Sequence, residues 1–434
     1  MRRIARAGAV VAAVSLLATA CGSGGDTNNE SDGESAPAPD EVSGSLTWWD
    51  TSDDTNEGPA FQELIDRFQE EYPDVDVTRQ YVPFDQAQNK FKTAAESGKG
   101  APDILRAEVA WVPEFASLGY LYALDGTAAL DDADDYFETP LSSNVFDGKT
   151  YGVPQVTDSL ALLYNKEIFE QAGVEAPTTW DEVADVAKTI KDETGADGIF
   201  LNPGGYFLLP FMYGEGGDLV DTEAQEIVVS SEANVAGIQA AADLVKSGAA
   251  PKPPAADAYA AMMTSFTEGD IAMIINGPWE VNNIRNAESF GGVENLGIAP
   301  VPGGSETAGA PVGGHNYVVW SGMDEAKADA AIAFIDFMNS VESQAFLAGE
   351  LGLLPTRQSA YEVAAVQDNE VVSAFKDVVD AAVARPWIPE GGQFFGPLDE
   401  MAVEVLVQGQ DPKKALDKVA KTYKSEVVPD YNVQ

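Results

Sequence analysis

Short apolar runs alternate with amphipathic segments along most of the chain. Residues 46–49 and 75–82 have the pattern of β-strands, and between them residues 60–71 place their apolar side chains on one helical face. A second helix is expected at residues 85–97, and the next strand begins at residues 104–105. Strands that alternate with helices at this spacing predict an α/β fold with a largely parallel sheet.

The same alternation continues through the rest of the chain. Residues 151–165 read as a long strand broken at Pro154, and residues 179–193 read as a helix with acidic residues near its amino end. Residues 303–314 are rich in Gly, Ala and Ser and predict a loop. Further helices are expected at residues 234–247, 324–339 and 373–384. A chain of 434 residues is too long for one compact core, so two domains are expected.

One stretch combines a strand, a breaker and a large aromatic residue. Residues 271–275 form an apolar run, Asn276-Gly277-Pro278 breaks it, and Trp279 begins a segment that reads as helical. Ligands of open α/β sheets bind beyond the carboxyl ends of the strands. This pattern places the indole of Trp279 at the mouth of a cleft, although a core aromatic at the seam between helix and sheet fits it equally well.

Charge and rare residues exclude several classes of function. The formal charge is -46, with 71 acidic and 25 basic residues, which argues against a nucleic-acid partner. One Cys and one His exclude an internal disulfide framework and a metal site with several His ligands. Residues 50–61 resemble a calcium loop but carry Thr55 and Phe61 where Gly and Glu are required. We therefore expect neither a metal nor a cofactor.

The amino-terminal residues resemble a targeting signal. Residues 1–20 combine a basic start with an uncharged stretch too short to span a bilayer, as in a lipoprotein signal peptide. Small residues precede Cys21, which resembles a bacterial lipoprotein box and predicts lipidation of Cys21; an ordinary secretory signal is the alternative. Residues 21–43 are polar and lack aromatic and basic residues, so they predict a disordered tether.

Acidic and aromatic residues occur together at four predicted strand ends. Carbohydrates suit such surfaces, because their C–H faces lie on aromatic rings and their hydroxyl groups need polar partners. The four groups are Trp49 with Asp50 and Asp53, Glu108 with Trp111, Asp158, and Trp279 with Glu280.

Several motifs resemble those of one known family. They are TWWDTSDDTNEGP at Thr47, VPFDQAQNKF at Val82, APDILRAEVAWVPEFA at Ala101, DGKTYGVPQVTDSLALLYNK at Asp147, INGPWE at Ile275, GGHN at Gly313, LPTR at Leu354 and FGPLD at Phe395. The chain from Leu46 onwards resembles the extracellular solute-binding proteins of ABC sugar importers, and specifically the maltose/maltodextrin-binding proteins in their Gram-positive lipoprotein form.

This resemblance implies a two-lobed, periplasmic-binding-protein-like (type II) α/β fold with a ligand cleft between the lobes. Residues 44–154 and 313–358 are expected to form the amino-terminal lobe, and residues 155–312 and 359–434 the carboxy-terminal lobe. The expected hinge crossings lie near residues 154–157, 311–314 and 358–366. The implied ligand-binding residues are Trp279, Tyr206 and Phe395 as a stacking platform, Asp158 as a hydroxyl acceptor, and Ser52, Asp53, Gln88, Glu108 and Trp111 in the opposite lobe.

The function implied by the resemblance is reversible capture of a neutral maltose- or maltodextrin-type oligosaccharide by a monomer that catalyses no reaction. Hinge closure would trap the sugar, and ABC permease subunits would receive it at the extracellular face of the cytoplasmic membrane. A lipid-anchored glycoside hydrolase is the alternative from another class, and trehalose or a xylo-oligosaccharide is an alternative ligand. Locally, Asp53 and Asp54 could cap a helix, Trp180 and Trp320 are expected in the core, and His315 is expected as a hydrogen-bonded hinge residue.

Overall fold

The computed structural model describes residues 42–306 and 309–434. The predicted export signal, Cys21 and nearly all of the predicted tether lie outside these residues. Val42, at the start of the described part, is already buried in a hydrophobic core. Among the described helices, none combines the length and the apolar character that crossing a bilayer requires.

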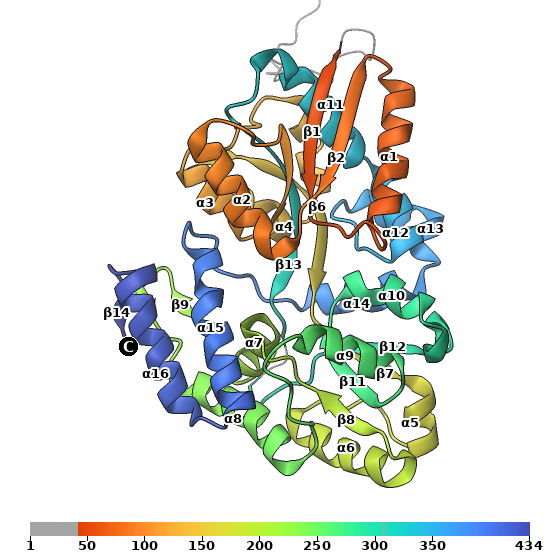
Figure 1. The fold of residues 1–434 in the computed structure, drawn as a ribbon, viewed down its shortest axis with the longest axis vertical. Helices are drawn as coiled ribbons and strands as arrows, with labels where there is room; N and C mark the ends of the chain where they lie inside the picture. The colour runs from red at the N-terminus through yellow and green to blue at the C-terminus, as the bar shows by residue number, and fades with distance from the viewer. Residues whose placement is uncertain (1–41, 307–308) are drawn as a thin grey trace, which may run out of the picture. The chain divides into compact units, whose positions relative to one another are not determined.

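The first sheet has five strands in the order β2-β1-β3-β13-β6 (Figure 1). Strand β1 (Gly44–Asp50) pairs in parallel with β2 (Val75–Tyr81) and β3 (Ile104–Glu108), which confirms the predicted βαβ start of the chain. Strand β13 (Val312–Val319) lies antiparallel between β3 and β6 (Gly152–Ser159). The carboxyl ends of β1 and β3 therefore meet at one edge of this sheet.

Helices cover both faces of the first sheet, so neighbouring residues of one strand enter different cores. Trp48 packs with Phe61, Phe68 and Phe334 on one face, and Trp49 belongs to the core on the other face. Both indoles are buried. The helices of this lobe are α1 (Gly58–Glu71), α2 (Phe84–Ser97), α3 (Trp111–Ser117), α4 (Glu138–Ser142), α11 (Ala328–Met338) and α12 (Val341–Leu351).

The second sheet has four strands in the order β12-β7-β11-β8. Strand β11 (Ile271–Asn276) lies parallel to β8 (Asp197–Phe200) and antiparallel to β7 (Ala161–Asn165), which in turn pairs antiparallel with β12 (Leu296–Pro300). The predicted strand at residues 271–275 is confirmed. Leu162 and Leu163 point into different cores, so this sheet is also covered on both faces.

The second lobe is largely helical. Thr179 and Glu182 form a capping box at the start of α6, and Trp180 stacks on Phe211 with ring centroids 3.7 Å apart, so its predicted core position is confirmed. Trp320 of the other lobe is half-buried. The helices of this lobe are α5 (Lys166–Ala172), α6 (Trp180–Thr194), α7 (Gly205–Gly214), α8 (Glu232–Ser247), α9 (Ala258–Thr267), α10 (Val281–Asn286), α14 (Glu370–Asp380), α15 (Phe395–Ala402) and α16 (Pro412–Thr422), and the short helix α13 (Ala364–Gln367) packs between α12 and α14.

Shorter strands complete the fold. A three-stranded sheet has the order β14-β10-β9, and a two-stranded hairpin joins β4 to β5. Their bounds are β4 (Val145–Phe146), β5 (Lys149–Thr150), β9 (Val220–Asp221), β10 (Glu226–Ile227) and β14 (Asn432–Val433).

Two long strands connect the two lobes. Strand β6 of the first sheet is followed, after the single residue Leu160, by β7 of the second sheet, and β13 pairs with β6 along its length (Figure 1). The predicted break at Pro154 is wrong, because Pro154 lies inside β6. The register shifts between His315 and Asn316 of β13, because Gln155 of β6 has no partner there, next to the proline that cannot donate a ladder hydrogen bond.

Two other predicted bounds also differ from the structure. The loop predicted at residues 303–314 ends earlier, since β13 begins at Val312. The helix predicted to end at residue 384 ends at Asp380. In both places the residues join segments that are distant in sequence: the Val312 amide donates to the Val383 carbonyl at 2.9 Å. Local patterns do not encode such a contact.

Replacing Gly237 by Ala should destabilise the protein. A Cβ atom at this position of α8 would lie 2.1 Å from the Phe211 carbonyl oxygen of α7, the helix that carries Tyr206. The backbones must separate, at a cost of about 1–3 kcal/mol that exceeds the gain in helix propensity of about 1 kcal/mol. Thermal unfolding should show a lower Tm for G237A. The matched control G396A, where the added Cβ meets no atom within 4 Å, should leave the Tm unchanged or raise it. Equal Tm shifts in the two variants would contradict this packing.

Candidate functional site

Trp279 lies where β11 ends and a short 3-10 helix (Pro278–Glu280) begins, as the sequence pattern predicts. Its indole is half-buried, and its Nε1 donates to the Tyr259 hydroxyl at 2.8 Å. That hydroxyl donates in turn to Glu280 Oε1 at 2.6 Å. A Cβ atom on Gly277 would lie 1.9 Å from the indole ring, so a glycine is required for this ring position. The ring is thus held firmly with part of its surface in solvent.

Aromatic rings form a continuous row across the second lobe. Phe395, at the start of α15, lies 6.1 Å from Tyr206, the second residue of α7, with a tilt of 58°. Tyr206 contacts Phe207 edge to face at 5.8 Å, and Phe207 lies 5.9 Å from Tyr259. Tyr259 holds Trp279. Two rings that the sequence analysis did not single out, Phe207 and Tyr259, therefore connect the three predicted stacking residues. The three predicted rings are half-buried.

Asp158 lies on β6 beside this aromatic row. Its register partner on β13 is Gly313, where a Cβ atom would lie 2.1 Å from Asp158 Oδ1 and 2.7 Å from the Tyr206 hydroxyl. The glycine therefore leaves room for both polar groups. Asp158 is 8% exposed, and among the described residues its carboxylate has no hydrogen-bond donor. Burial, together with the nearby charge of Glu108, raises the pKa of Asp158 to about 7.

Glu108, at the carboxyl end of β3, forms an ion pair with Arg385 of the second lobe. Its other carboxylate oxygen accepts from the Ala110 amide at 2.9 Å. Arg385 is buried, and its guanidinium carbon lies 5.7 Å from the ring centre of Tyr206 and 5.5 Å from that of Phe395. Burial opposes the charge of Arg385, but Glu108 more than offsets it, so its pKa is raised. The predicted ligand residue Glu108 is thus bound to the other lobe.

The sequence analysis missed Arg385. It stands in the segment Ala384-Arg385-Pro386-Trp387, where no helical or strand pattern marks it. The ring of Trp387 also lies near the guanidinium, with its centre 5.8 Å from the guanidinium carbon. A basic residue directly before a proline and a tryptophan in a strongly acidic chain was the one available signal.

The loop after β1 carries two of the predicted residues. Asp53 is exposed and accepts from the Thr55 amide at 2.8 Å, so it closes a turn. The helix-capping alternative is wrong, because Glu57 is the N-cap residue of α1 and no side chain of the described residues caps this helix. Ser52 is buried, and its backbone carbonyl accepts from Arg79 at 2.6 Å. The loop reaches the second lobe through Asn56, which the sequence analysis also missed. Asn56 Nδ2 donates to the Trp279 carbonyl at 3.2 Å, and its Oδ1 accepts from Asn282 at 2.9 Å.

Buried charges fix this loop against the sheet. Arg79 donates to Asp50 Oδ2 at 2.6 Å, and Arg106 donates through Nε to Gln155 at 2.8 Å and through Nη1 to Thr51 at 3.1 Å. Burial raises the pKa of Glu57, which lies 3.6 Å from Arg106. This network joins β1, β2, β3 and β6, so the polar loop is anchored to the strand that leads into the hinge.

Gln88 and Trp111 lie together on the same lobe. Gln88 donates to Glu114 at 2.9 Å, and Lys92 forms an ion pair with the same carboxylate. Trp111 is 5% exposed, so most of its ring packs in the hydrophobic core. Phe84, beside it, is 51% exposed. A Cβ atom on Gly392 of the second lobe would lie 3.0 Å from Gln88 Nε2 and 3.7 Å from Trp111 Cδ1. Both predicted residues therefore touch the opposite lobe.

His315 lies on β13 between these groups. The predicted hydrogen-bonded role is wrong, because neither ring nitrogen has a partner within the described part of the chain. Burial and the nearby cations Arg106 and Arg385 hold its pKa well below the usual value, so the ring is neutral. It adjoins Phe84 edge to face, with ring centres 6.0 Å apart.

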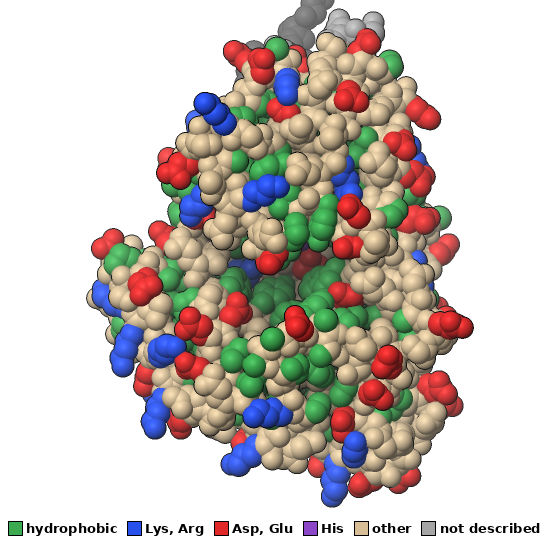
Figure 2. All heavy atoms as spheres, in the orientation of Figure 1, with side chains coloured by type: hydrophobic (Ala, Val, Ile, Leu, Met, Phe, Trp, Pro, Cys, Tyr) green, Lys and Arg blue, Asp and Glu red, His purple; other side chains and the backbone are tan. Residues whose placement is uncertain are grey.

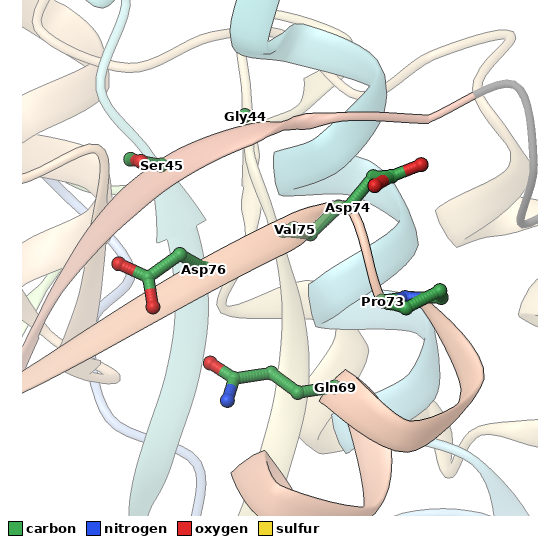
Figure 3. Close-up of a pocket in the computed structure, with 7 residues that line it drawn as sticks. All are labelled: Gly44, Ser45, Gln69, Pro73, Asp74, Val75 and Asp76. Carbon is green, nitrogen blue, oxygen red and sulfur yellow. The ribbon is translucent and has the colours of Figure 1, made fainter.

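The space-filling view shows a hollow between the two lobes, with hydrophobic side chains on its walls and acidic ones at its rim (Figure 2). Two cavities lie elsewhere. One of about 460 Å³ is lined by Gly44, Gln69 and Asp76 at the amino ends of β1 and β2 (Figure 3). Another of about 680 Å³ is lined by Lys191, Asp197 and Asp270 at the amino ends of β8 and β11. The predicted site residues lie at the opposite, carboxyl ends of these strands, where α/β sheets bind ligands.

Asp158→Asn should change how stability depends on pH. The folded protein holds the Asp158 proton up to about pH 7, whereas the unfolded chain loses it near pH 3.8. Between these values the folded state binds more protons, so this group lowers stability as pH rises, with no further change above about pH 7. D158N lacks the group, and its Tm relative to wild type should be higher at pH 8 than at pH 4.5, by an amount corresponding to at least about 1 kcal/mol. A Tm difference that is the same at both pH values would contradict the buried, unpartnered carboxylate.

Comparisons with known proteins agree with this geometry. Residues 52–345 match the family model of bacterial extracellular solute-binding proteins. A maltotriose-binding protein of Pyrococcus abyssi is 26% identical over 380 residues, which are 86% of this chain and 80% of that protein. A galactooligosaccharide-binding protein of Bacillus subtilis is 26% identical over 428 residues, 96% of this chain and 95% of that protein.

Solved structures with the same fold include binding proteins with and without ligand. The GacH receptor of Streptomyces glaucescens, known unliganded and in complex with acarbose or an acarbose homolog, is 44% identical with a TM-score of 0.87, covering 90% of this chain and 100% of that one. The maltose-bound MalE3 of T. maritima shares the fold with a TM-score of 0.79 at 24% identity, covering 88% and 99%. The family match spans more than half of the chain. The chain therefore belongs to the bacterial extracellular solute-binding proteins, has their two-lobed α/β fold, and is a binding protein rather than an enzyme.

Proposed function

We propose that this protein captures a neutral oligosaccharide of the maltose/maltodextrin class between its lobes and releases it unaltered. The observation that carries the proposal is the row of half-buried rings from Phe395 to Trp279 at the strand ends of the second lobe. Each ring is fixed by packing or a hydrogen bond and keeps an exposed face. Such a row suits successive pyranose units, whose C–H faces lie on rings.

Polar groups beside the row suit a ligand rich in hydroxyl groups. The Asp158 carboxylate has no donor among the described residues, so a hydroxyl group can donate to it. The two buried arginines at the site, Arg106 and Arg385, are already paired with Glu57 and Glu108. Because these cations are neutralised and the chain is strongly acidic, an anionic ligand is disfavoured.

The names of relatives support the sugar class. A maltotriose-binding protein is 26% identical, and a receptor solved with acarbose is 44% identical. A galactooligosaccharide-binding relative of similar identity makes other oligosaccharides the alternatives. A thermal-shift screen of maltotriose, acarbose, a galactooligosaccharide, trehalose and a xylo-oligosaccharide separates them, since specific binding raises the Tm with ligand concentration.

Closure about the hinge is the proposed capture step. The lobes meet at the Glu108–Arg385 ion pair and at Asn56, which contacts Trp279 and Asn282. We place the amino-terminal lobe at residues 44–154 and 313–358 and the carboxy-terminal lobe at residues 155–312 and 359–434. A ligand that contacts both lobes favours the closed population by its differential affinity for the two states. Micromolar binding, about −8 kcal/mol, is within reach of several stacking contacts and hydrogen bonds.

The proposed cellular setting is an ABC importer. Ligand-loaded protein would be received by permease subunits at the extracellular face of the cytoplasmic membrane. A lipid on Cys21 would keep the protein there, with residues 21–43 as tether. Metabolic labelling with a radioactive fatty acid tests the anchor: Cys21→Ser should abolish incorporation and release the protein from the membrane.

Trp279→Ala should weaken maltotriose binding by at least about fivefold, because a fixed indole face is worth about 1 kcal/mol or more beyond simple burial. Isothermal titration calorimetry measures the affinity, and the Tm reports on folding. The control Trp320→Ala removes a half-buried indole of the other lobe and should lower the Tm without changing affinity. A large Tm loss with unchanged affinity in W279A would assign the indole to the core instead.

Glu108→Gln should weaken binding of every sugar that the protein accepts by a similar factor, of the order of tenfold or more. Arg385 is buried where it pairs with Glu108 of the other lobe, and without its carboxylate partner the cation keeps an uncompensated desolvation cost in this arrangement of the lobes. Calorimetry with two or more sugars gives, for each sugar, the ratio of the wild-type affinity to the affinity of E108Q. Lys413→Gln, which breaks an exposed pair with Asp417 inside α16, should leave all affinities unchanged. Loss for one sugar alone would show that Glu108 acts as a direct ligand and not as a tie between the lobes.

A further inference from the structure

Phe84 is the most exposed large hydrophobic side chain of the described residues, at 51%. It is the first residue of α2, directly after Pro83. The sequence analysis gave it no role, although it lies within VPFDQAQNKF. A single exposed hydrophobic side chain is common on protein surfaces, so the position of this ring, and not its exposure alone, decides whether it has a role.

The ring is nevertheless held in a defined position. Its centre lies 5.2 Å from that of the buried Trp111, with the ring planes tilted by 32°, and 6.0 Å from that of His315. Trp111 is fixed in the core of α2 and α3, and His315 is fixed on the hinge strand β13. Phe84 is therefore backed by rigid neighbours and presents its remaining surface outwards.

The surroundings of Phe84 identify which space it faces. Trp111, on which it packs, and Gln88, one turn further along α2, both lie against Gly392 of the second lobe. His315 is the register partner of Glu108, which pairs with Arg385 of that lobe. Since neighbours of Phe84 on α2, α3 and β13 all border the other lobe, its exposed ring borders the space between the lobes.

We propose that Phe84 is a ligand-contact residue of the first lobe, which stacks on a pyranose ring when the lobes close. This inference rests on the proposed function and extends it. The row from Phe395 to Trp279 supplies rings from the second lobe, and Phe84 supplies one from the first. The sugar is then held between aromatic surfaces on both sides, and the first lobe recognises its C–H face in addition to its hydroxyl groups.

The test measures maltotriose affinity of Phe84→Ala, Phe84→Leu and Phe84→Tyr by calorimetry, with the Tm of each. The loss of a stacking ring should weaken binding about five- to tenfold in F84A and less in F84L, whereas F84Y should bind like wild type. Because the ring is half-exposed, the Tm should hardly change. The matched control is Leu118→Ala, which truncates a 45% exposed apolar side chain at the end of α3, and it should bind like wild type.

The outcomes separate this inference from the proposed function. If wild-type protein binds no maltotriose or related sugar, the proposed function fails before Phe84 is tested. If wild-type protein binds and F84A binds equally well, Phe84 is not a ligand contact and the inference is overturned. Unchanged affinity of F84A with reduced sugar uptake in cells would also overturn it and assign the exposed ring to a contact with the permease.

Discussion

A buried ion pair between the lobes is the constraint on which the site depends. Glu108 stands at the end of a strand of the first sheet, and Arg385 stands among the rings of the second lobe. Burying either charge alone is costly, so each lobe carries a group that is satisfied only when the other lobe is adjacent. The same guanidinium packs on Tyr206 and Phe395, which orients two rings of the aromatic row. Lobe contact and ring placement are thus coupled through one side chain.

The hinge strands place the other polar groups of the site near the Glu108–Arg385 ion pair. Strands β6 and β13 are paired along their length, and Gly313 leaves open the space that Asp158 and the Tyr206 hydroxyl share. Its neighbour Gly314 has a φ of +125°, a conformation that other residues rarely adopt. Two consecutive glycines therefore serve two needs: free volume beside a carboxylate and an unusual backbone angle at the crossing of the lobes.

The sequence predicted what depends on local pattern. The strand–breaker–Trp279 stretch, the capped helix α6 and the apolar face of α1 were confirmed, since periodicity and capping residues encode them. Motif resemblance supplied the fold class and the ligand-facing candidates. The sequence did not predict Arg385, Asn56 or Phe84, nor the start of β13. The roles of Arg385 and Asn56 arise from contacts across more than 200 residues, the start of β13 from pairing with distant segments, and the role of Phe84 from exposure beside the other lobe. Pro154 shows the reverse error, in which a local rule for breaking strands was overruled by a bulge at Gln155 of the same strand, next to the proline.

The account reduces to one physical claim, that two hinged lobes close on a neutral sugar held against aromatic rings and a buried carboxylate. Small-angle X-ray scattering of the purified protein during a maltotriose titration tests it most directly. The account predicts that the radius of gyration falls and saturates as sugar is added, with the same half-saturation concentration as the heat of binding. A radius of gyration that stays constant while maltotriose binds to saturation would contradict it.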